Sequence, residues 1–189
     1  MVMNGESCLE GQLLIAMPSM KDPRFERAVI YICVHTTSGA MGVVINRLAD
    51  NVSFVELLNQ LGIETSDDGA SIRVHVGGPV ETSRGLVLHS ADYTQEATIM
   101  VSENVALTAS LDILRKLATG SGPQNGLLAL GYAGWGPGQL EQEIRSNGWL
   151  HVPADDQLLF DHHLDSKWDR ALSKIGFDVS MLSVEAGNA

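Results

Sequence analysis

The chain has 189 residues, of which 44% are hydrophobic and 19% are charged. This composition is that of a globular protein with its own core, and it excludes a disordered chain. Twelve basic residues stand against 23 acidic ones, a formal net charge of −11, which disfavours direct nucleic-acid binding because contacts to the phosphate backbone depend mainly on lysine and arginine.

The N-terminal stretch lacks a basic segment followed by a long apolar run, so no signal peptide is expected. No apolar run approaches the roughly 20 residues of a spanning helix, and we expect a cytoplasmic protein without a membrane segment. The two cysteines, Cys8 and Cys33, have no CxxC spacing and imply no disulfide framework. Cys33 lies in an apolar run and is expected to be buried, whereas Cys8 lies in a polar leader.

Strand signals occur along the whole chain, as short apolar or β-branched runs bounded by turn residues. The runs cover residues 12–17, 28–35, 41–46, 71–78, 85–90, 98–102 and 126–134. Within 71–78, Ile72, Val74 and Val76 alternate with polar positions. If this run pairs with 85–90 as a hairpin, Arg73, His75 and His89 would share one exposed face.

Helix signals are stronger and mark four segments. In 52–62, Ser53 and Glu56 form a capping-box pattern before an apolar stripe. The segment 106–120 repeats this logic with Leu107, Leu111 and Leu114 on one side, and 166–176 places Ser166 at a cap position. The fourth helix follows the glycine-rich stretch that begins at Gly131.

The order of these elements does not alternate regularly between strand and helix, as a doubly wound parallel sheet requires. We therefore predict the α+β class, with a curved, mixed, largely antiparallel sheet and helices packed on its faces. No linker or repeat is visible, so one compact domain over residues 1–189 is expected, with 1–10 and 183–189 frayed.

The stretch "GYAGWGPGQLEQEI", residues 131–144, precedes a short polar helix. Gly136 can cap that helix, Pro137 suits its first position, and Asn147 with Gly148 can close it. The stretch matches no phosphate-binding motif, and two glutamates at 141 and 143 would repel an anion at this helix start. Structure alone explains most of the motif.

A neutral ligand remains a second interpretation of this stretch. Glycine-rich backbone beside an aromatic side chain is a common pocket wall. The candidate ligand-binding residues are Gly134, Trp135, Gly136 and Gln139. No catalytic residue, metal ligand or cofactor is assigned.

Two other groups of residues are candidates for a functional site, one as metal ligands and one as a basic cluster. His162 and His163 are flanked by Asp161 and Asp165, but adjacent histidines diverge and make poor zinc ligands; a solvated loop is the favoured interpretation. The basic residues Lys21, Arg24 and Arg27 are interrupted by acidic residues and indicate a solvated turn. No nucleophile elbow, HExxH or kinase signature occurs, so the residues alone do not support an enzyme.

Three long stretches nevertheless carry a family pattern. They are "GQLLIAMPSMKDPRFERAVIYICVHTTSGAMGVVINR", "VHVGGPVETSRGLVLHS" and "LGYAGWGPGQLEQEIRSNGWL". In this order they resemble the YqgE/AlgH family of bacterial proteins over nearly the whole chain. The resemblance implies a compact α+β domain whose biochemical role is largely unassigned. The family has been labelled as transcriptional regulators through alginate control in one branch, and it supplies no established catalytic residues.

The sequence leaves three alternative functions open. The first is a regulatory module that acts through an unknown protein partner or small ligand. The second is an enzyme of unrecognised class that uses surface histidines. The third is a direct DNA-binding regulator, which the net charge of −11 disfavours.

Overall fold

The computed structural model describes residues 8–65 and 72–176. Its internal contacts divide the chain into two compact units, one of Met1–Asn46 with Gly134–Ala189 and one of Arg47–Ala133. The expected single domain over 1–189 stays a prediction. Most of the two termini expected to fray lies outside the described residues.

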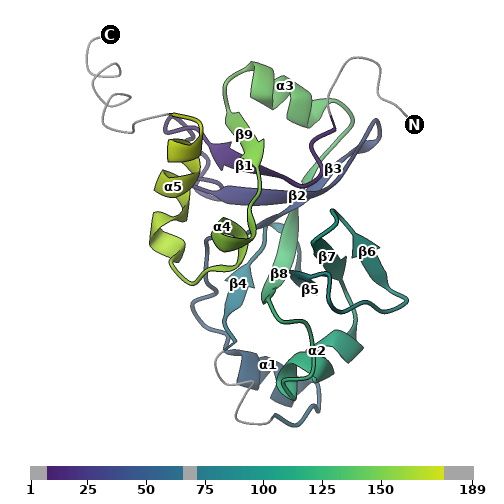
Figure 1. Ribbon diagram of the computed structural model, residues 1–189. Helices are drawn as coiled ribbons and strands as arrows, with labels where there is room; N and C mark the ends of the chain where they lie inside the picture. The colour runs from purple at the N-terminus through teal and green to yellow at the C-terminus, as the bar shows by residue number, and fades with distance from the viewer. Residues whose placement is uncertain (1–7, 66–71, 177–189) are drawn as a thin grey trace. The chain divides into compact units, whose positions relative to one another are not determined.

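The unit formed by both ends of the chain contains an antiparallel sheet (Figure 1). Its strand order is β3-β2-β1-β9, and β2 and β3 form an antiparallel hairpin. The strands are β1 (Gln12–Ala16), β2 (Val29–Thr36), β3 (Gly39–Val44) and β9 (Trp149–Pro153). The helices of this unit are α3 (Gln139–Arg145), α4 (Asp156–Phe160), the short 3₁₀ helix η2 (Leu164–Ser166) and α5 (Lys167–Lys174).

The unit of Arg47–Ala133 contains a mixed sheet with the order β6-β7-β5-β8, and β4 pairs parallel with β8. Its strands are β4 (Val74–Val76), β5 (Val80–Ser90), β6 (Thr98–Met100), β7 (Val105–Thr108) and β8 (Gly126–Trp135), whose last two residues belong to the other unit. The helices are α1 (Phe54–Gln60) and α2 (Leu111–Ala118). The predicted α+β class, with a mixed and largely antiparallel sheet, is confirmed.

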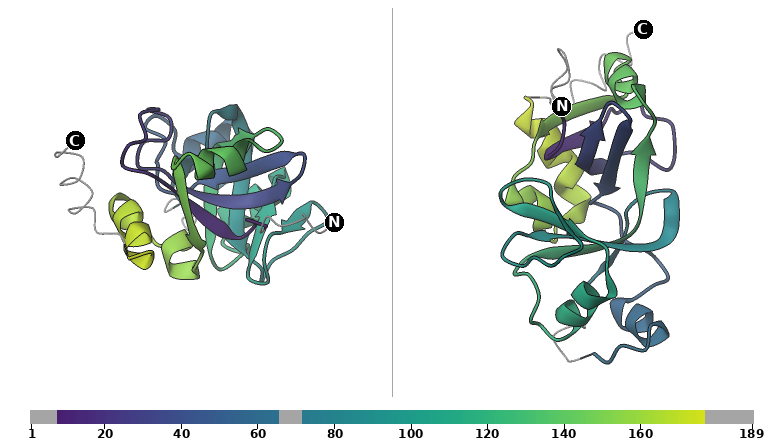
Figure 2. Two further views of the ribbon diagram at one scale, coloured as in Figure 1. Left: turned by 90° about the horizontal axis from the view of Figure 1, so that it is seen from above. Right: turned by 90° about the vertical axis from the view of Figure 1, so that its right-hand side faces the viewer.

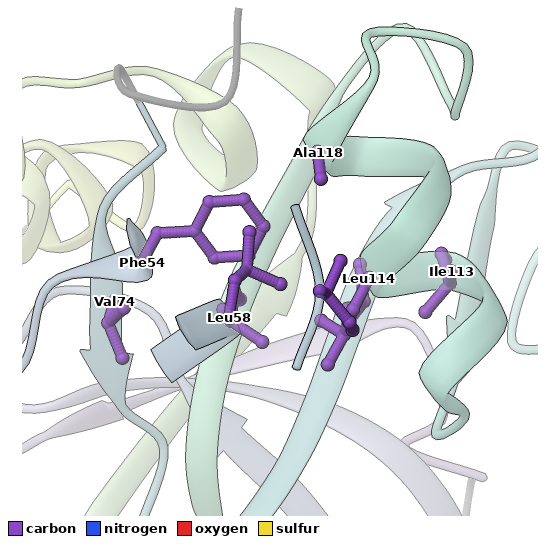
Figure 3. Close-up of a cluster of buried hydrophobic side chains, with 9 residues drawn as sticks. Phe54, Leu58, Val74, Ile113, Leu114 and Ala118 are labelled. Carbon is purple, nitrogen blue, oxygen red and sulfur yellow. The ribbon is translucent and has the colours of Figure 1, made fainter. Parts of the chain in front are cut away.

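The helices α1 and α2 lie side by side in this unit (Figures 1 and 2) and close an apolar core over the sheet. Phe54 and Leu58 from α1 meet Ile113 and Leu114 from α2 (Figure 3). The predicted capping box of α1 is present, because Ser53 and Glu56 each accept a hydrogen bond from the other's backbone N–H. The cap satisfies two donors that the helix cannot satisfy itself.

Four local expectations are corrected. Leu107 belongs to β7 rather than to the helix stripe, because α2 begins only after its cap at Ser110. Ser166 is the N-cap residue of α5 as predicted, but its side chain makes no capping bond, since η2 precedes α5. The helix α4 was not predicted. In β4, Val74 is buried as the alternation predicts, but His75 is buried as well and Val76 is exposed.

The last correction has a topological cause. The strand β8 pairs with both β4 and β5, so β4 and β5 do not form the expected hairpin. His75 also makes an antiparallel bridge to Leu48 on its other side. A strand segment with neighbours on both sides buries residues that an edge position would expose.

Three glycines allow main chain to pack on main chain beside β8. A Cβ on Gly77 would lie 2.2 Å from the carbonyl oxygen of Gly131, and one on Gly78 would lie 2.1 Å from the carbonyl carbon of Tyr132. Gly131 itself has φ +76° and faces the Gly78 carbonyl oxygen. No side chain fits between these backbones, which explains Gly77 and Gly78 in "HVGGPV" and Gly131 in "LGYAG".

We predict that Gly131→Ala destabilises the protein by about 3 kcal/mol or more, because the new Cβ meets backbone and the φ is unfavourable. Denaturant unfolding measures the change. Gly126→Ala in the same strand is the control, since its Cβ would meet nothing closer than 3.7 Å, and it should change stability by less than about 1 kcal/mol. Equal effects of the two variants would contradict this account.

Candidate functional site

The glycine-rich loop after β8 forms a tight turn into α3. The N–H of Gln139 donates to the Gly136 carbonyl at 3.1 Å, and Gly138 has φ 72° and ψ −3°. With Pro137 before it, this is a type II turn, in which proline suits the second position and glycine the third. Gly138, rather than Gly136, therefore precedes the helix, and Pro137 lies in the turn instead of the first helical position.

The Trp135 side chain is part of the core beside this loop. It is only 8% exposed, and its ring meets the Trp149 ring edge-on with centroids 6.1 Å apart. Its indole N–H donates to the Glu143 carboxylate at 2.7 Å. The indole has therefore found its polar partner within the fold, as buried tryptophans usually do.

The second glutamate of α3 is also engaged. The Leu9 backbone N–H donates to His35 Nδ1 at 3.0 Å, so the imidazole carries its proton on Nε2 and donates it to Glu141 at 2.5 Å. Burial opposes ionisation of Glu141, but hydrogen bonds from its own backbone and from His35 hold its pKa below the usual range. The pair ties α3 to β2 and to the chain before β1.

The four candidate ligand-binding residues lie close together in the loop, but they differ in how far they are buried. Trp135 is buried, whereas Gly134, Gly136 and Gln139 are exposed. The Gln139 side chain accepts a hydrogen bond from the Gly136 N–H at 2.9 Å, which occupies one of the loop's donors. Ligand binding by these residues stays a prediction.

The end of α3 follows the predicted closure. Asn147 has φ 61°, its N–H donates to the Ile144 carbonyl, and the Gly148 N–H donates to the Glu143 carbonyl at 2.8 Å. These two bonds define a Schellman motif. The loop and its helix are therefore fixed at both ends by local chemistry that the sequence carries.

A pocket that the sequence did not predict lies beside α1. It has a volume of about 540 Å³, within the usual range of small-molecule sites. Its lining comprises the neutral polar Asn51, Asn59, Gln60 and Ser83, the apolar Val52, Leu57 and Leu130, and a single charged residue, Glu56. Four of these residues come from α1, while Ser83 comes from β5 and Leu130 from β8. Because these segments are far apart in the sequence, no local sequence pattern could predict the pocket. We refer to it as the α1 pocket.

The histidines expected at the surface of the sheet are buried. His75 is 6% exposed and bonds to the Leu128 carbonyl at 3.2 Å, and His89 is fully buried. The hypothesis of an exposed cluster with Arg73 is therefore wrong. Its physical reason is the position of β8, which lies where the predicted hairpin partner would be.

His89 is part of a directed chain of hydrogen bonds. Its Nδ1 donates to the Ser90 carbonyl at 2.8 Å, so its Nε2 accepts from the Thr108 hydroxyl at 2.7 Å. Thr108 in turn accepts from Thr98, whose hydroxyl oxygen accepts from the Gln95 N–H. The chain is satisfied only with a neutral imidazole, and burial lowers the His89 pKa despite the bond to Ser90.

The paired histidines at 162 and 163 are exposed and precede α5. Their neighbour Asp161 accepts two hydrogen bonds from Arg170, at 2.5 and 2.9 Å, and these lower the Asp161 pKa. Within residues 8–65 and 72–176 no group of three or more histidine, cysteine or carboxylate side chains could hold a metal ion. Cys33 is buried, which raises its pKa to about 12, and Cys8 is exposed.

Two basic residues near the N-terminus, Arg24 and Arg27, contact other side chains of the fold. Arg24 forms an ion pair with Asp22 at 2.7 Å and lies over the Phe25 ring. Arg27 lies over the Trp168 ring at 5.0 Å. Arg24 and Arg27 therefore each contact a different aromatic ring within the fold.

Comparison with known proteins decides the family. A model of AlgH-like proteins matches residues 13–180. The chain belongs to the AlgH-like family. It is 53% identical to a UPF0301 protein of Afipia carboxidovorans, over 98% of this chain and 92% of that one, and 55% identical to one of Bradyrhizobium diazoefficiens, over 96% and 88%.

Solved structures agree with this assignment. The solution structure of AlgH from Pseudomonas aeruginosa matches with a TM-score of 0.79 and 39% identity, covering the whole of both chains. A Corynebacterium diphtheriae protein shares the fold at a TM-score of 0.72, 21% identity and coverage of 91% and 90%. Among the described helices of this AlgH-like chain, none has the length and apolar character to span a membrane.

We predict that Trp135→Ala lowers stability by about 3–5 kcal/mol, because it leaves a cavity against Trp149 and removes the partner of Glu143. Gln139→Ala removes one exposed hydrogen bond and should cost about 1 kcal/mol. Thermal unfolding measures both, and a small loss in Trp135→Ala would show that the ring is not a core residue.

We also predict a pH dependence from His89. Because its folded pKa is depressed, the unfolded chain binds a proton that the folded one does not, and stability falls as pH drops below about 6.5 towards the folded pKa. The slope from this one group is at most about 1.4 kcal/mol per pH unit. Nitrogen NMR of the ring tests the cause directly: His89 should keep its Nδ1–H form below pH ~6.5, and titration at or above that pH would contradict it.

Proposed function

We propose that this AlgH-like protein is a non-catalytic cytoplasmic regulatory module that acts by binding a small ligand and a protein partner. The α1 pocket carries the proposal. Its volume suits a small molecule, and its lining combines apolar surface with four neutral hydrogen-bonding side chains.

The charge of the lining sets the ligand class. Glu56 is the single charged residue of the lining, and one of its oxygens already accepts the Ser53 N–H. An anionic ligand would find no cation among these residues and would meet a carboxylate. We therefore propose an uncharged or cationic ligand whose polar groups bond to Asn59 and Ser83 while its apolar part lies against Leu57 and Leu130.

The loop at Gly134, Trp135, Gly136 and Gln139 is kept as a second binding surface. What supports it is the exposure of Gly134, Gly136 and Gln139 beside one another in the chain. The loop offers fewer free groups than the α1 pocket, since Gln139 and Gly136 bond to each other.

The other two functions have weaker support. Of the four histidines considered for an enzyme, only His162 and His163 are exposed, because His75 and His89 are buried and hydrogen-bonded. Direct DNA binding would need a basic surface, and the net charge is −11 with Arg24 and Arg27 held by Asp22 and Trp168.

The test is ligand capture with a pocket variant. The purified chain is equilibrated with the filtered small-molecule fraction of a bacterial cytoplasmic extract, recovered, and its bound molecules are identified by mass spectrometry. We predict that Ser83→Arg abolishes retention of the uncharged or cationic molecules that the unmodified chain retains, because a long cationic side chain fills the pocket.

Thr82→Arg is the matched control, since it adds the same charge at an exposed neighbour that does not line the pocket. It should retain the same molecules as the unmodified chain. Retention unchanged by Ser83→Arg, but lost in Gln139→Ala, would move the site to the loop. Retention unchanged by both would refute small-ligand binding at either place.

A further inference from the structure

The strand β6 ends the sheet of the Arg47–Ala133 unit. It pairs with β7, in the register Thr98↔Thr108, Ile99↔Leu107 and Met100↔Ala106. The described part of the chain adds no strand beyond it, and Figure 1 shows β6 at the outer side of β7. One edge of β6 is therefore open.

The main-chain groups on this edge can be assigned from the register. The Val101 N–H donates to the Val105 carbonyl, so the next hydrogen-bonded pair is Ile99 with Leu107, because bonded and non-bonded pairs alternate in antiparallel strands. Thr98 and Met100 then direct their main-chain groups away from β7. The Thr98 N–H accordingly donates to the Gln95 carbonyl, which leaves the Thr98 carbonyl and both main-chain groups of Met100 on the open edge.

The side chains of the edge are apolar and exposed on both faces of the sheet. Ile99 is 52% exposed and Met100 is 50% exposed, and neighbouring residues of a strand point to opposite faces. From 97 to 101 the sequence has no charge and no proline. Natural edge strands usually carry charged residues or proline, which prevent pairing with another strand. In β6 the only such protection is that the strand is short.

Side-chain hydrogen bonds fix β6 to the neighbouring strand β7 and to the cap of α2. The Thr98 hydroxyl bonds to the Thr108 hydroxyl at 2.9 Å, and Gln95 bonds to Ser110, the cap of α2. The position of β6 is thus fixed before any partner arrives, which reduces the entropy cost of binding.

The surroundings of the edge are acidic. From Gly85 to Leu114 the sequence has four acidic residues and no lysine or arginine. Asp112 is paired with Arg115, and Asp92 accepts bonds from Ser90 and Gln124. Glu96 and Glu103, which flank β6, are exposed and form no ion pair with any described residue.

We propose that the β6 edge docks an extended segment of a partner protein, with apolar residues at its centre and lysine or arginine at its ends, which adds to the sheet as a further strand. Main-chain bonds to Thr98 and Met100 would supply affinity, and Glu96 and Glu103 would select the basic ends. The inference deepens the protein-contact part of the proposed function.

A second copy of this chain fits the edge less well. Pairing of two β6 strands would bring the unpaired glutamates of one copy towards those of the other. Like charges placed across an interface disfavour the pairing. The chemistry of the edge therefore favours a basic partner.

The test uses a fluorescent synthetic peptide of alternating valine and threonine with two lysines at each end. We predict that it binds the full chain, more weakly as salt rises, and that binding protects the Met100 amide from hydrogen exchange. A peptide with glutamates in place of the lysines should bind at least about tenfold more weakly.

Met100→Pro removes the N–H on the open edge, and an edge position tolerates proline because that N–H makes no bond to β7. Peptide affinity should fall by at least about tenfold. Glu96→Lys with Glu103→Lys should reverse the preference between the two peptides. Asp50→Lys with Glu64→Lys changes the net charge equally at exposed positions outside residues 85–114 and should leave the preference unchanged.

Failure of the lysine peptide to bind, or equal binding to Met100→Pro, would overturn the proposal. Dimerisation of the unmodified chain that Met100→Pro abolishes would also overturn it, in favour of a second copy. The small-molecule capture with Ser83→Arg is a separate readout, so the edge and the α1 pocket can fail independently.

Discussion

Close contact of main chain on main chain along β8 is the constraint on which the rest of the structure depends. In the Arg47–Ala133 unit, Gly77 and Gly78 pass Gly131 and Tyr132 with no room for a Cβ. In the other unit, a Cβ on Gly39 would lie 2.3 Å from the Trp135 carbonyl oxygen. These contacts set where β4 lies beside β8 and where the start of β3 lies beside Trp135, and the side chains that pack around them follow.

The shape of the loop after β8 also depends on residues that have little or no side chain. Its turn needs a proline and a left-handed glycine, and the helix that follows uses two carboxylates as anchors, Glu143 on Trp135 and Glu141 on His35. Both glutamates would repel an anion, and both are occupied within the fold. The motif is thus explained as a joint between strand and helix.

The α1 pocket and the β6 edge, the two binding surfaces that the sequence did not predict, both lie in the Arg47–Ala133 unit. Among the described residues, the exposed large hydrophobic side chains all belong to the Arg47–Ala133 unit, at Leu48, Leu61, Val76, Val80, Ile99, Met100 and Leu111. Single exposed apolar residues are ordinary, but Ile99 and Met100 share an open strand edge.

The sequence by itself determined what depends on neighbouring residues: the α+β class, the capping box at Ser53, the Schellman closure at Asn147, and the strands β1 to β6 and β8. Such features arise from contacts within a few positions, and a single sequence displays them directly. The sequence did not predict β7 and β9. Only the tertiary structure decided that β8 separates β4 from β5, which buries His75 and His89, and that Ser83 and Leu130 meet α1. Pairing between distant strands depends on the packing of the whole sheet, and no local pattern encodes which strand becomes the neighbour.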